Sequence, residues 1–144
     1  SEKGIDPAES VVLFGRSLGG AVAVEMAARH QVRGVIVESA FTSVREMARK
    51  AYSFLPSGLL VRMIESRFDA LSRIPDVHSP LLVLHGDRDN LVPVEHGRRL
   101  FDAGNDPKSF YFIEGASHND THLVGVKRYF DALRAFIEDP MDPR

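Results

Sequence analysis

Four short apolar runs constrain the fold of this chain more than any other feature of its sequence. They are SVVLFG at 10–15, GVIVES at 34–39, PLLVLHG at 80–86 and SFYFIEG at 109–115. Their apolar residues follow one another without polar alternation, a pattern typical of parallel strands that are buried on both faces. We therefore predict a parallel sheet of about four strands.

Segments with helical signals separate these runs. The predicted helices span 19–30, 42–55, 94–104 and 121–139. Strands that alternate with helices imply right-handed crossovers and an α/β fold with helices on both faces of the sheet. Residues 56–79 do not fit the alternation, and we expect 42–79 to form a cap-like, linking helical segment within a single, partial domain, 1–144.

Composition and charge exclude several classes of function. The net charge is −2 and the Lys and Arg residues are spread along the chain, which offers no electrostatic footprint for nucleic acid or an acidic membrane. The absence of cysteine excludes disulfides, a thiolate zinc site and thiol redox catalysis. No apolar stretch is long enough to span a bilayer. We expect a cytoplasmic protein that acts on a small-molecule substrate.

The end of the first run carries the motif Gly-x-Ser-x-Gly, formed by Gly15, Ser17 and Gly19. A serine between a strand and a helix, with small residues two positions on either side, is the context of a nucleophile elbow. The helix that follows directs the N–H of Leu18 toward a developing oxyanion. Phosphate-loop motifs do not fit, because Ser17 interrupts G-x-G-x-x-G and no Lys follows the glycine pair.

A serine nucleophile needs a base and an orienting acid. The third run is followed by Asp87 and Asp89, and the fourth by His118. Because loops that follow parallel strands leave the same edge of the sheet, these residues can converge with Ser17. The chain order Ser, Asp, His is also that of α/β-hydrolases. We favour Asp89 as the acid and a turn-capping role for Asp87.

Four segments, LFGRSLGGAVA, VESAFTS, LVLHGDRDNLVP and IEGASHND, occur in this order and cover nearly the whole chain. Together they resemble the C-terminal half of an α/β-hydrolase, most closely the small esterase and serine-aminopeptidase-like branch. The resemblance implies a serine hydrolase that acts on an ester, thioester or amide and needs no cofactor. It also implies that Ser17 is the nucleophile, Asp89 the acid, His118 the base and Leu18 an oxyanion-hole residue.

In the family that the sequence resembles, several strands and the loop with the second oxyanion donor precede the nucleophile. No His-Gly-Gly or His-Gly-x-x-Gly segment stands before Ser17. We therefore expect a truncated domain with impaired turnover, since the loss of one donor typically costs ~10²- to 10³-fold in rate. The strand at 10–15 would then form an open sheet edge, and we predict a homodimer that pairs through it.

Several other polar residues have both a functional and a structural interpretation. Glu38 follows the second run, where some hydrolases carry their acid, but a structural role that binds neighbouring backbone N–H groups is favoured. His118, Asp120 and His122 form H-x-D-x-H, which could hold a metal, yet no second cluster supports a metal site, and helix capping by Asp120 or Thr121 explains the pattern.

The remaining histidines and aromatic residues receive structural interpretations. His85 is predicted to be a packed strand-end residue. The histidines expected at the surface are His30, His78 and His96. The aromatic residues assigned to the core are Phe110, Tyr111, Phe112, Tyr129, Phe130 and Phe136. Residues 42–70, together with Phe41, could form an apolar acyl-binding wall, although helix packing explains their composition equally well.

Two functions from other classes stay open. One is a non-catalytic hydrolase remnant that self-associates or binds a partner through its first strand. The other is a flavodoxin-like binding module, in which acidic residues at strand ends hold a metal ion or a phosphate.

Overall fold

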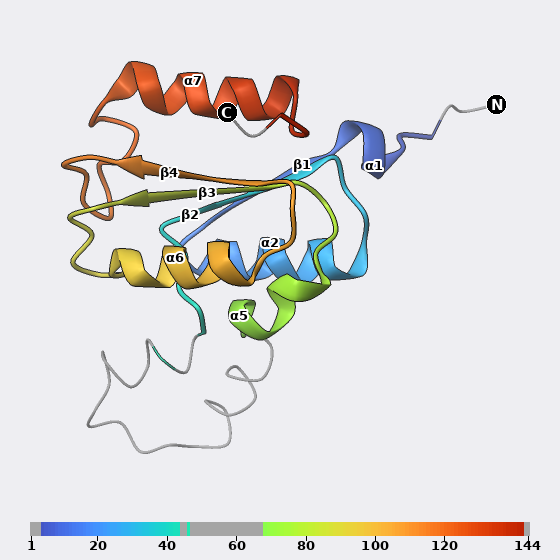
Figure 1. Ribbon diagram of the computed structural model, residues 1–144, viewed down its shortest axis with the longest axis horizontal. Coiled ribbons are helices and arrows are strands. Elements are labelled where there is room, and N and C mark those ends of the chain that lie inside the picture. Colours follow the sequence, from blue (N-terminus) through green and yellow to red (C-terminus); the bar gives the residue numbers. More distant parts are fainter. Residues whose placement is uncertain (1–3, 44–45, 47–67, 143–144) are drawn as a thin grey trace.

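The architecture is built on a four-stranded parallel sheet (Figure 1). The computed structural model describes residues 4–43, 46 and 68–142. Each strand is paired with the strand that precedes or follows it in the chain. The strands are β1 (Val12–Arg16), β2 (Gly34–Glu38), β3 (Leu81–Gly86) and β4 (Lys108–Ile113). The predicted parallel sheet is confirmed.

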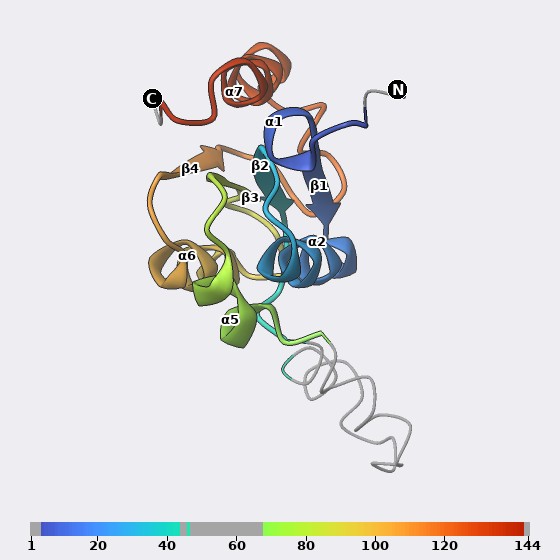
Figure 2. The same cartoon turned by 90° about the vertical axis from the view of Figure 1, so that its right-hand side faces the viewer.

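Helices cover both faces of this sheet. They are α1 (Pro7–Ser10), α2 (Leu18–Arg29), α5 (Ala70–Arg73), the 3₁₀ helix η1 (Ile74–Asp76), α6 (Val94–Ala103) and α7 (Val126–Glu138). Figure 2 shows α2, α5 and α6 on one face and α7 on the other. Because the strands are arranged in chain order, right-handed crossovers between them all lie on the same face of the sheet. The helix that follows the last strand, α7, covers the opposite face.

Two apolar clusters fill the space between the sheet and its helices. On one face, Val35 and Val83 pack with residues of α2, η1 and α6, and on the other, Ile36 and Leu84 pack with α7. All residues of β2 and β3 are buried. Burial on both faces explains why these strands lack polar alternation, as the sequence predicted.

Three sequence-based expectations are wrong in detail. The last helix begins at Val126 instead of residue 121, because Gly125 has φ 63°, a left-handed conformation that cannot continue a right-handed helix. Among the aromatic residues assigned to the core, Phe112 is 42% exposed and Phe130 is 49% exposed. His96, expected at the surface, is buried, and its Nδ1 lies 3.0 Å from Thr42 Oγ1.

The linking segment predicted at 42–79 is described only in part. Its last portion contains α5 and η1, which pack beneath α2. Ser43 forms an isolated antiparallel bridge with Asp69. The helix predicted at 42–55 and most of the predicted acyl-binding wall lie outside the described residues.

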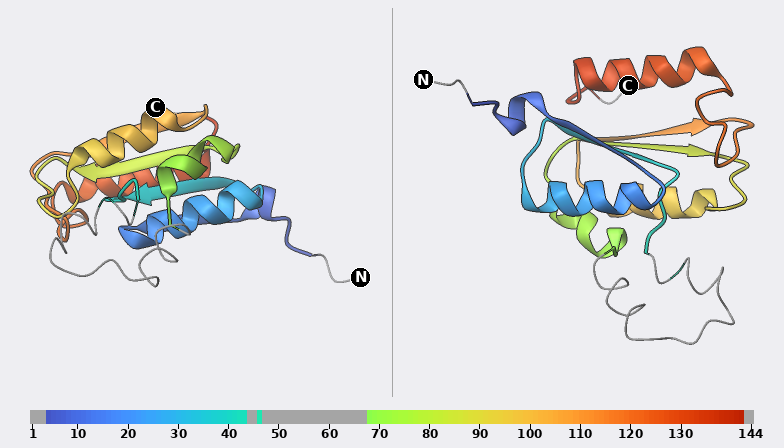
Figure 3. Two further views of the ribbon diagram at one scale, coloured as in Figure 1. Left: turned by 90° about the horizontal axis from the view of Figure 1, so that it is seen from below. Right: turned by 180° about the vertical axis from the view of Figure 1, so that it is seen from behind.

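The parallel arrangement brings the carboxyl ends of all strands to one edge of the domain. The elbow between β1 and α2, the loop between β3 and α6, and the loop between β4 and α7 leave from this edge (Figure 3). These connections carry Ser17, Asp89 and His118. The fold therefore places all three predicted catalytic residues at the same edge of the sheet.

Candidate active site

Ser17 stands between β1 and α2 in a strained backbone conformation. Its φ of 53° and ψ of −120° are rare for a residue with a side chain. The Ser17 N–H donates to the carbonyl oxygen of Glu38 at 2.9 Å, which ties the turn to the end of β2. Such strain at a strand-to-helix turn is the geometry of a nucleophile elbow.

The two glycines of the motif have different roles in this turn. A Cβ at Gly15 would overlap with the carbonyl oxygen of Gly19 and would lie 2.8 Å from Ala23 Cβ. A Cβ at Gly19 would meet no atom within 4 Å. The close approach of β1 and α2 therefore requires glycine at 15 but not at 19.

The N-terminus of α2 lies directly beside the serine. Leu18 is the first helical residue, so its N–H has no acceptor within the helix. The Ser17 side chain is half-buried, and its hydroxyl makes no hydrogen bond with the described part of the chain. The hydroxyl and the Leu18 N–H are both available to a ligand at this edge.

Asp89 and His118 form a buried hydrogen-bonded pair. His118 Nδ1 lies 2.8 Å from Asp89 Oδ2, and the Asp89 side chain is fully buried. Asp89 Oδ1 accepts hydrogen bonds from the N–H groups of Leu91 at 3.0 Å and Val92 at 2.7 Å. With both oxygens occupied, the carboxylate holds His118 in the tautomer that carries its proton on Nδ1 and leaves Nε2 as an acceptor.

His85 supports the loop that carries Asp89. It is fully buried at the end of β3, and its Nε2 lies 2.8 Å from the carbonyl oxygen of Val92. A Cβ at Gly97 would lie 2.5 Å from His85 Nδ1, so α6 packs directly against the ring. Burial lowers the pKa of His85, which keeps the imidazole neutral. The histidine is a packed strand-end residue, as predicted.

Glu38 is buried at the end of β2 and accepts hydrogen bonds through both carboxylate oxygens. Oε1 pairs with Arg16 Nε at 3.3 Å and accepts from the Thr121 hydroxyl, and Oε2 accepts from the Tyr129 hydroxyl at 2.7 Å. Burial, with the bond to Glu38, raises the pKa of Tyr129 well above its ordinary range. The structural role predicted for Glu38 is thus filled by side-chain donors and not by backbone N–H groups.

The alternative site residues lie elsewhere or have structural partners. Asp87 is exposed, and its Oδ1 accepts from the Gly115 N–H at 2.7 Å. Asp120 Oδ1 accepts from the Ser117 N–H at 2.6 Å, within the loop that carries His118. Thr121, expected as a possible helix cap, precedes the helix by several residues and binds Glu38. Over the described ranges, no group of three or more His, Asp or Glu residues could hold a metal ion.

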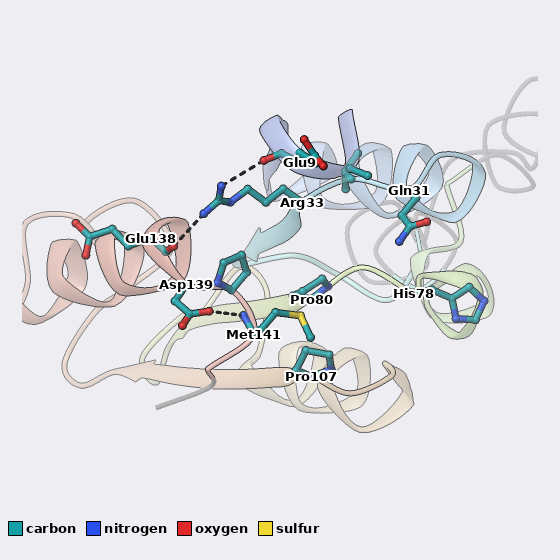
Figure 4. A pocket seen from close by; sticks show the side chains of 12 residues that line it. Glu9, Gln31, Arg33, His78, Pro80, Pro107, Glu138, Asp139 and Met141 are labelled. Carbon is teal, nitrogen blue, oxygen red and sulfur yellow. Dashed lines mark hydrogen bonds between the residues drawn. The ribbon is translucent and has the colours of Figure 1, made fainter. Parts of the chain in front are cut away.

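A groove of about 530 Å³ lies at the opposite edge of the domain (Figure 4). Its lining includes Arg33, Pro80 and Pro107, which precede β2, β3 and β4 respectively. Arg33 spans the groove and donates to the backbone carbonyl oxygens of Glu9 and Glu138. The groove is therefore at the amino ends of the strands, away from Ser17 and His118.

A family comparison agrees with this geometry. Residues 1–135 match the model of the prolyl oligopeptidase family, described as peptidase family S9. The chain belongs to the prolyl oligopeptidase family. In the described part of this family member, no helix has the length and apolar character that a membrane span requires.

Individual relatives match nearly the whole of this chain in sequence. The chain is 36% identical over 135 residues to an uncharacterized protein of Mycobacterium tuberculosis, a match that covers 94% of this chain and 47% of that protein. It is 32% identical to human alpha/beta hydrolase domain-containing protein 17B, with 96% and 44% covered. The chain thus spans about half the length of these relatives.

Solved structures complete the comparison. The esterase domain of a Rhodothermus marinus protein superimposes with a TM-score of 0.62 at 25% identity, with 85% of this chain and 59% of that chain covered. The sequence-based prediction of an α/β-hydrolase fold is confirmed.

Proposed function

We propose that this member of the prolyl oligopeptidase family is a serine hydrolase that transfers an acyl group from an ester, thioester or amide to water. The observation that carries the proposal is the buried Asp89–His118 pair, which lies at the carboxyl ends of the strands, as does the strained Ser17 elbow. A buried carboxylate that orients a histidine beside a serine on a nucleophile elbow is the arrangement that activates a hydroxyl.

In the proposed reaction, His118 Nε2 removes the Ser17 hydroxyl proton as Oγ attacks the substrate carbonyl carbon. The carbonyl oxygen becomes an oxyanion that accepts a hydrogen bond from the Leu18 N–H. Collapse of this intermediate breaks the bond to the leaving group, which takes the proton from His118. Water then attacks the acylated serine with His118 as base, releasing a carboxylic acid and the free hydroxyl. Asp89 stabilises the imidazolium in both steps.

Two features bear on the rate of this reaction. Ser17 Oγ and His118 make no hydrogen bond in the described structure, and catalytic hydrogen bonds often tighten only when substrate is bound. The oxyanion donor that we assign among the described residues is the Leu18 N–H. We propose that turnover is slow when the Leu18 N–H acts as the oxyanion donor by itself, since the loss of one of two donors costs roughly 10²- to 10³-fold in rate.

Labelling with a fluorophosphonate, which phosphonylates an activated serine, tests the proposal. We expect one adduct by intact mass on the purified chain and none on Ser17→Ala. Ser39→Ala is a matched control, because Ser39 also follows a strand with a positive φ, 46°, but its hydroxyl is buried. Labelling that persists in Ser17→Ala, or a folded wild-type chain that is not labelled, contradicts the proposal.

The ester is the substrate class we test first. The esterase domain of Rhodothermus marinus, to which this chain is 25% identical, supports an ester. Hydrolysis of p-nitrophenyl esters of increasing chain length, compared with matched thioesters and anilides, identifies the preferred bond. The predicted acyl-binding wall at 42–70 stays a prediction.

We also propose that the chain forms a homodimer through the open edge of β1. In the described sheet β1 has a neighbour on one side only, and Phe14 is 49% exposed there. The other edge strand, β4, is protected by charge, since Lys108 stands at its start and the Arg98 guanidinium lies 5.0 Å from the centre of the Phe112 ring. A two-fold axis would pair two copies of β1.

Sedimentation velocity over a range of concentrations tests this dimer. We expect Phe14→Lys to shift the chain to monomer. Phe112→Lys, a similarly exposed aromatic position on the opposite edge strand (42% against 49% exposed), should leave the dimer intact. A monomer at high micromolar concentration contradicts the proposal.

A further inference from the structure

One oxygen of the Glu38 carboxylate contacts residues beside Ser17 and His118, and the other contacts a residue of α7. Its Oε1 faces Arg16, which directly precedes Ser17, and Thr121, which belongs to the loop that carries His118. Its Oε2 faces Tyr129 on α7. The Glu38 side chain is 2% exposed, and its bonds with Thr121 and Tyr129 are buried, whereas the Arg16 side chain is 36% exposed.

A buried carboxylate is a costly way to fill this space. Desolvation of an ionised group is unfavourable unless several donors compensate for it, and apolar residues of similar volume are often as stabilising. In the sheet, Glu38 lies between Arg16 of β1 and the buried Leu84 of β3. Packing alone gives no reason for an acid at this position, because an apolar residue of similar volume could fill it.

Arg16 extends the contacts of Glu38 to the backbone of His118. Its guanidinium pairs with Glu38 through Nε and donates through a second nitrogen to the His118 carbonyl oxygen and to Asn119 Oδ1, the latter at 3.3 Å. The loop is thus held at His118 by Arg16 and at Thr121 by Glu38 itself. Asp89 holds only the imidazole, so these contacts fix the backbone independently of the ring.

We propose that Glu38 is the positioning residue of His118, which it acts on through Arg16 and Thr121. This inference rests on the proposed function. Because a displacement of about 1 Å in a catalytic group can cost roughly 10²-fold in rate, loss of either Oε1 contact slows the reaction of Ser17. Loss of the Oε2 contact weakens the packing of α7 without moving His118.

Substitutions of the donors separate these two roles of one carboxylate. Thr121→Val removes the hydroxyl that binds Oε1 at nearly constant volume, Thr121→Ser restores it, and Tyr129→Phe removes the hydroxyl that binds Oε2. Each variant is compared with wild type by the rate of fluorophosphonate labelling, by urea unfolding, and by the low-field proton resonance of His118 Nδ1–H. That resonance is identified by its loss in His118→Asn.

We expect Thr121→Val to label at least tenfold more slowly and to broaden the low-field resonance, and Thr121→Ser to recover both. We expect Tyr129→Phe to keep the wild-type labelling rate and resonance while its urea midpoint falls. Glu38→Gln, which keeps an acceptor but loses the charge that holds Arg16, should behave like Thr121→Val if it folds.

The proposal is overturned if Thr121→Val keeps both wild-type values, or if Tyr129→Phe slows labelling as much as Thr121→Val. The His118 Nδ1–H resonance does not depend on labelling, so it tests the positioning role of Glu38 even if the proposed hydrolase function is wrong. If wild type is not labelled, a resonance that is broadened in Thr121→Val and unchanged in Tyr129→Phe still supports positioning by Glu38. A resonance that keeps its wild-type line width in Thr121→Val, or is absent from wild type, refutes it.

Discussion

Replacing Asp89 by Asn changes the hydrogen bonding of His118 while nearly preserving the shape of the site. The Asn carbonyl oxygen can take the place of Oδ1 and accept from the N–H groups of Leu91 and Val92, at 3.0 Å and 2.7 Å in the native chain. Its NH₂ group then faces His118 Nδ1 at the position of Oδ2, 2.8 Å away. Because the amide is a donor, Nδ1 must accept, and the ring proton moves to Nε2.

A histidine protonated on Nε2 cannot remove the proton of Ser17. We therefore expect the rate of fluorophosphonate labelling of Asp89→Asn to fall by about 10⁴-fold, the loss seen when the acid of a serine triad is replaced in this way. The assay is the second-order rate of adduct formation by intact mass at pH 7.5, with Ser17→Ala as the baseline.

Asp89→Ala provides the comparison for stability. It leaves two buried donors, the Val92 N–H and His118 Nδ1–H, without an acceptor, at about 1 to 3 kcal/mol each. The expected loss in the free energy of unfolding is therefore about 2 to 6 kcal/mol, measured by urea denaturation. Asp89→Asn keeps an acceptor for the N–H groups of Leu91 and Val92, so its free energy of unfolding should fall by less than that of Asp89→Ala. An Asn variant that labels within tenfold of wild type would refute the tautomer argument.

Further expected outcomes concern the elbow, the core and pH. Gly15→Ala should destabilise the fold by about 1 to 3 kcal/mol, whereas Gly19→Ala, with open space around its Cβ, should stabilise α2 by about 0.5 to 1 kcal/mol in urea denaturation. Leu84→Ala, at a fully buried position, should cost about 2 to 5 kcal/mol in the same assay. Burial lowers the pKa of His85 from its ordinary value of 6.5, so below pH 6.5 the unfolded chain binds a proton that the native chain does not. The urea midpoint should therefore fall as the pH drops from 7 to 5, and less steeply in His85→Gln. Equal slopes in the two proteins would exclude His85 as the cause.

The sequence predicted the strands and the placement of Ser17, Asp89 and His118 after the carboxyl ends of strands for related physical reasons. Strands buried on both faces must be apolar throughout, so β2 and β3 are visible as unbroken runs. Parallel strands send their following loops to one edge, so residues after different strands meet without any knowledge of the intervening chain.

The sequence analysis did not predict features that depend on a particular backbone conformation or on contacts between distant residues. The pattern of THLVGVKRYF is compatible with a helix from residue 121, and only the backbone conformation of Gly125 shows that the helix starts later. His96 lies in the polar segment VEHGRR, yet it is buried and contacts Thr42, which precedes it by 54 residues. The donors of Glu38 likewise come from residues far apart in the sequence. A strand-end acid followed by a buried hydroxyl in another loop is a signal too common to identify such a site.

The order of the strands has a consequence for how the domain is assembled. Each described strand pairs only with its neighbours in the chain. During synthesis, β2, β3 and β4 can therefore each add to a strand that the ribosome has already released. His118 follows β4, so the Asp89–His118 pair forms only after the last of these strands is available. Among the described site residues, the catalytic base is thus the last to be made, and the elbow at Ser17 can fold before its base exists.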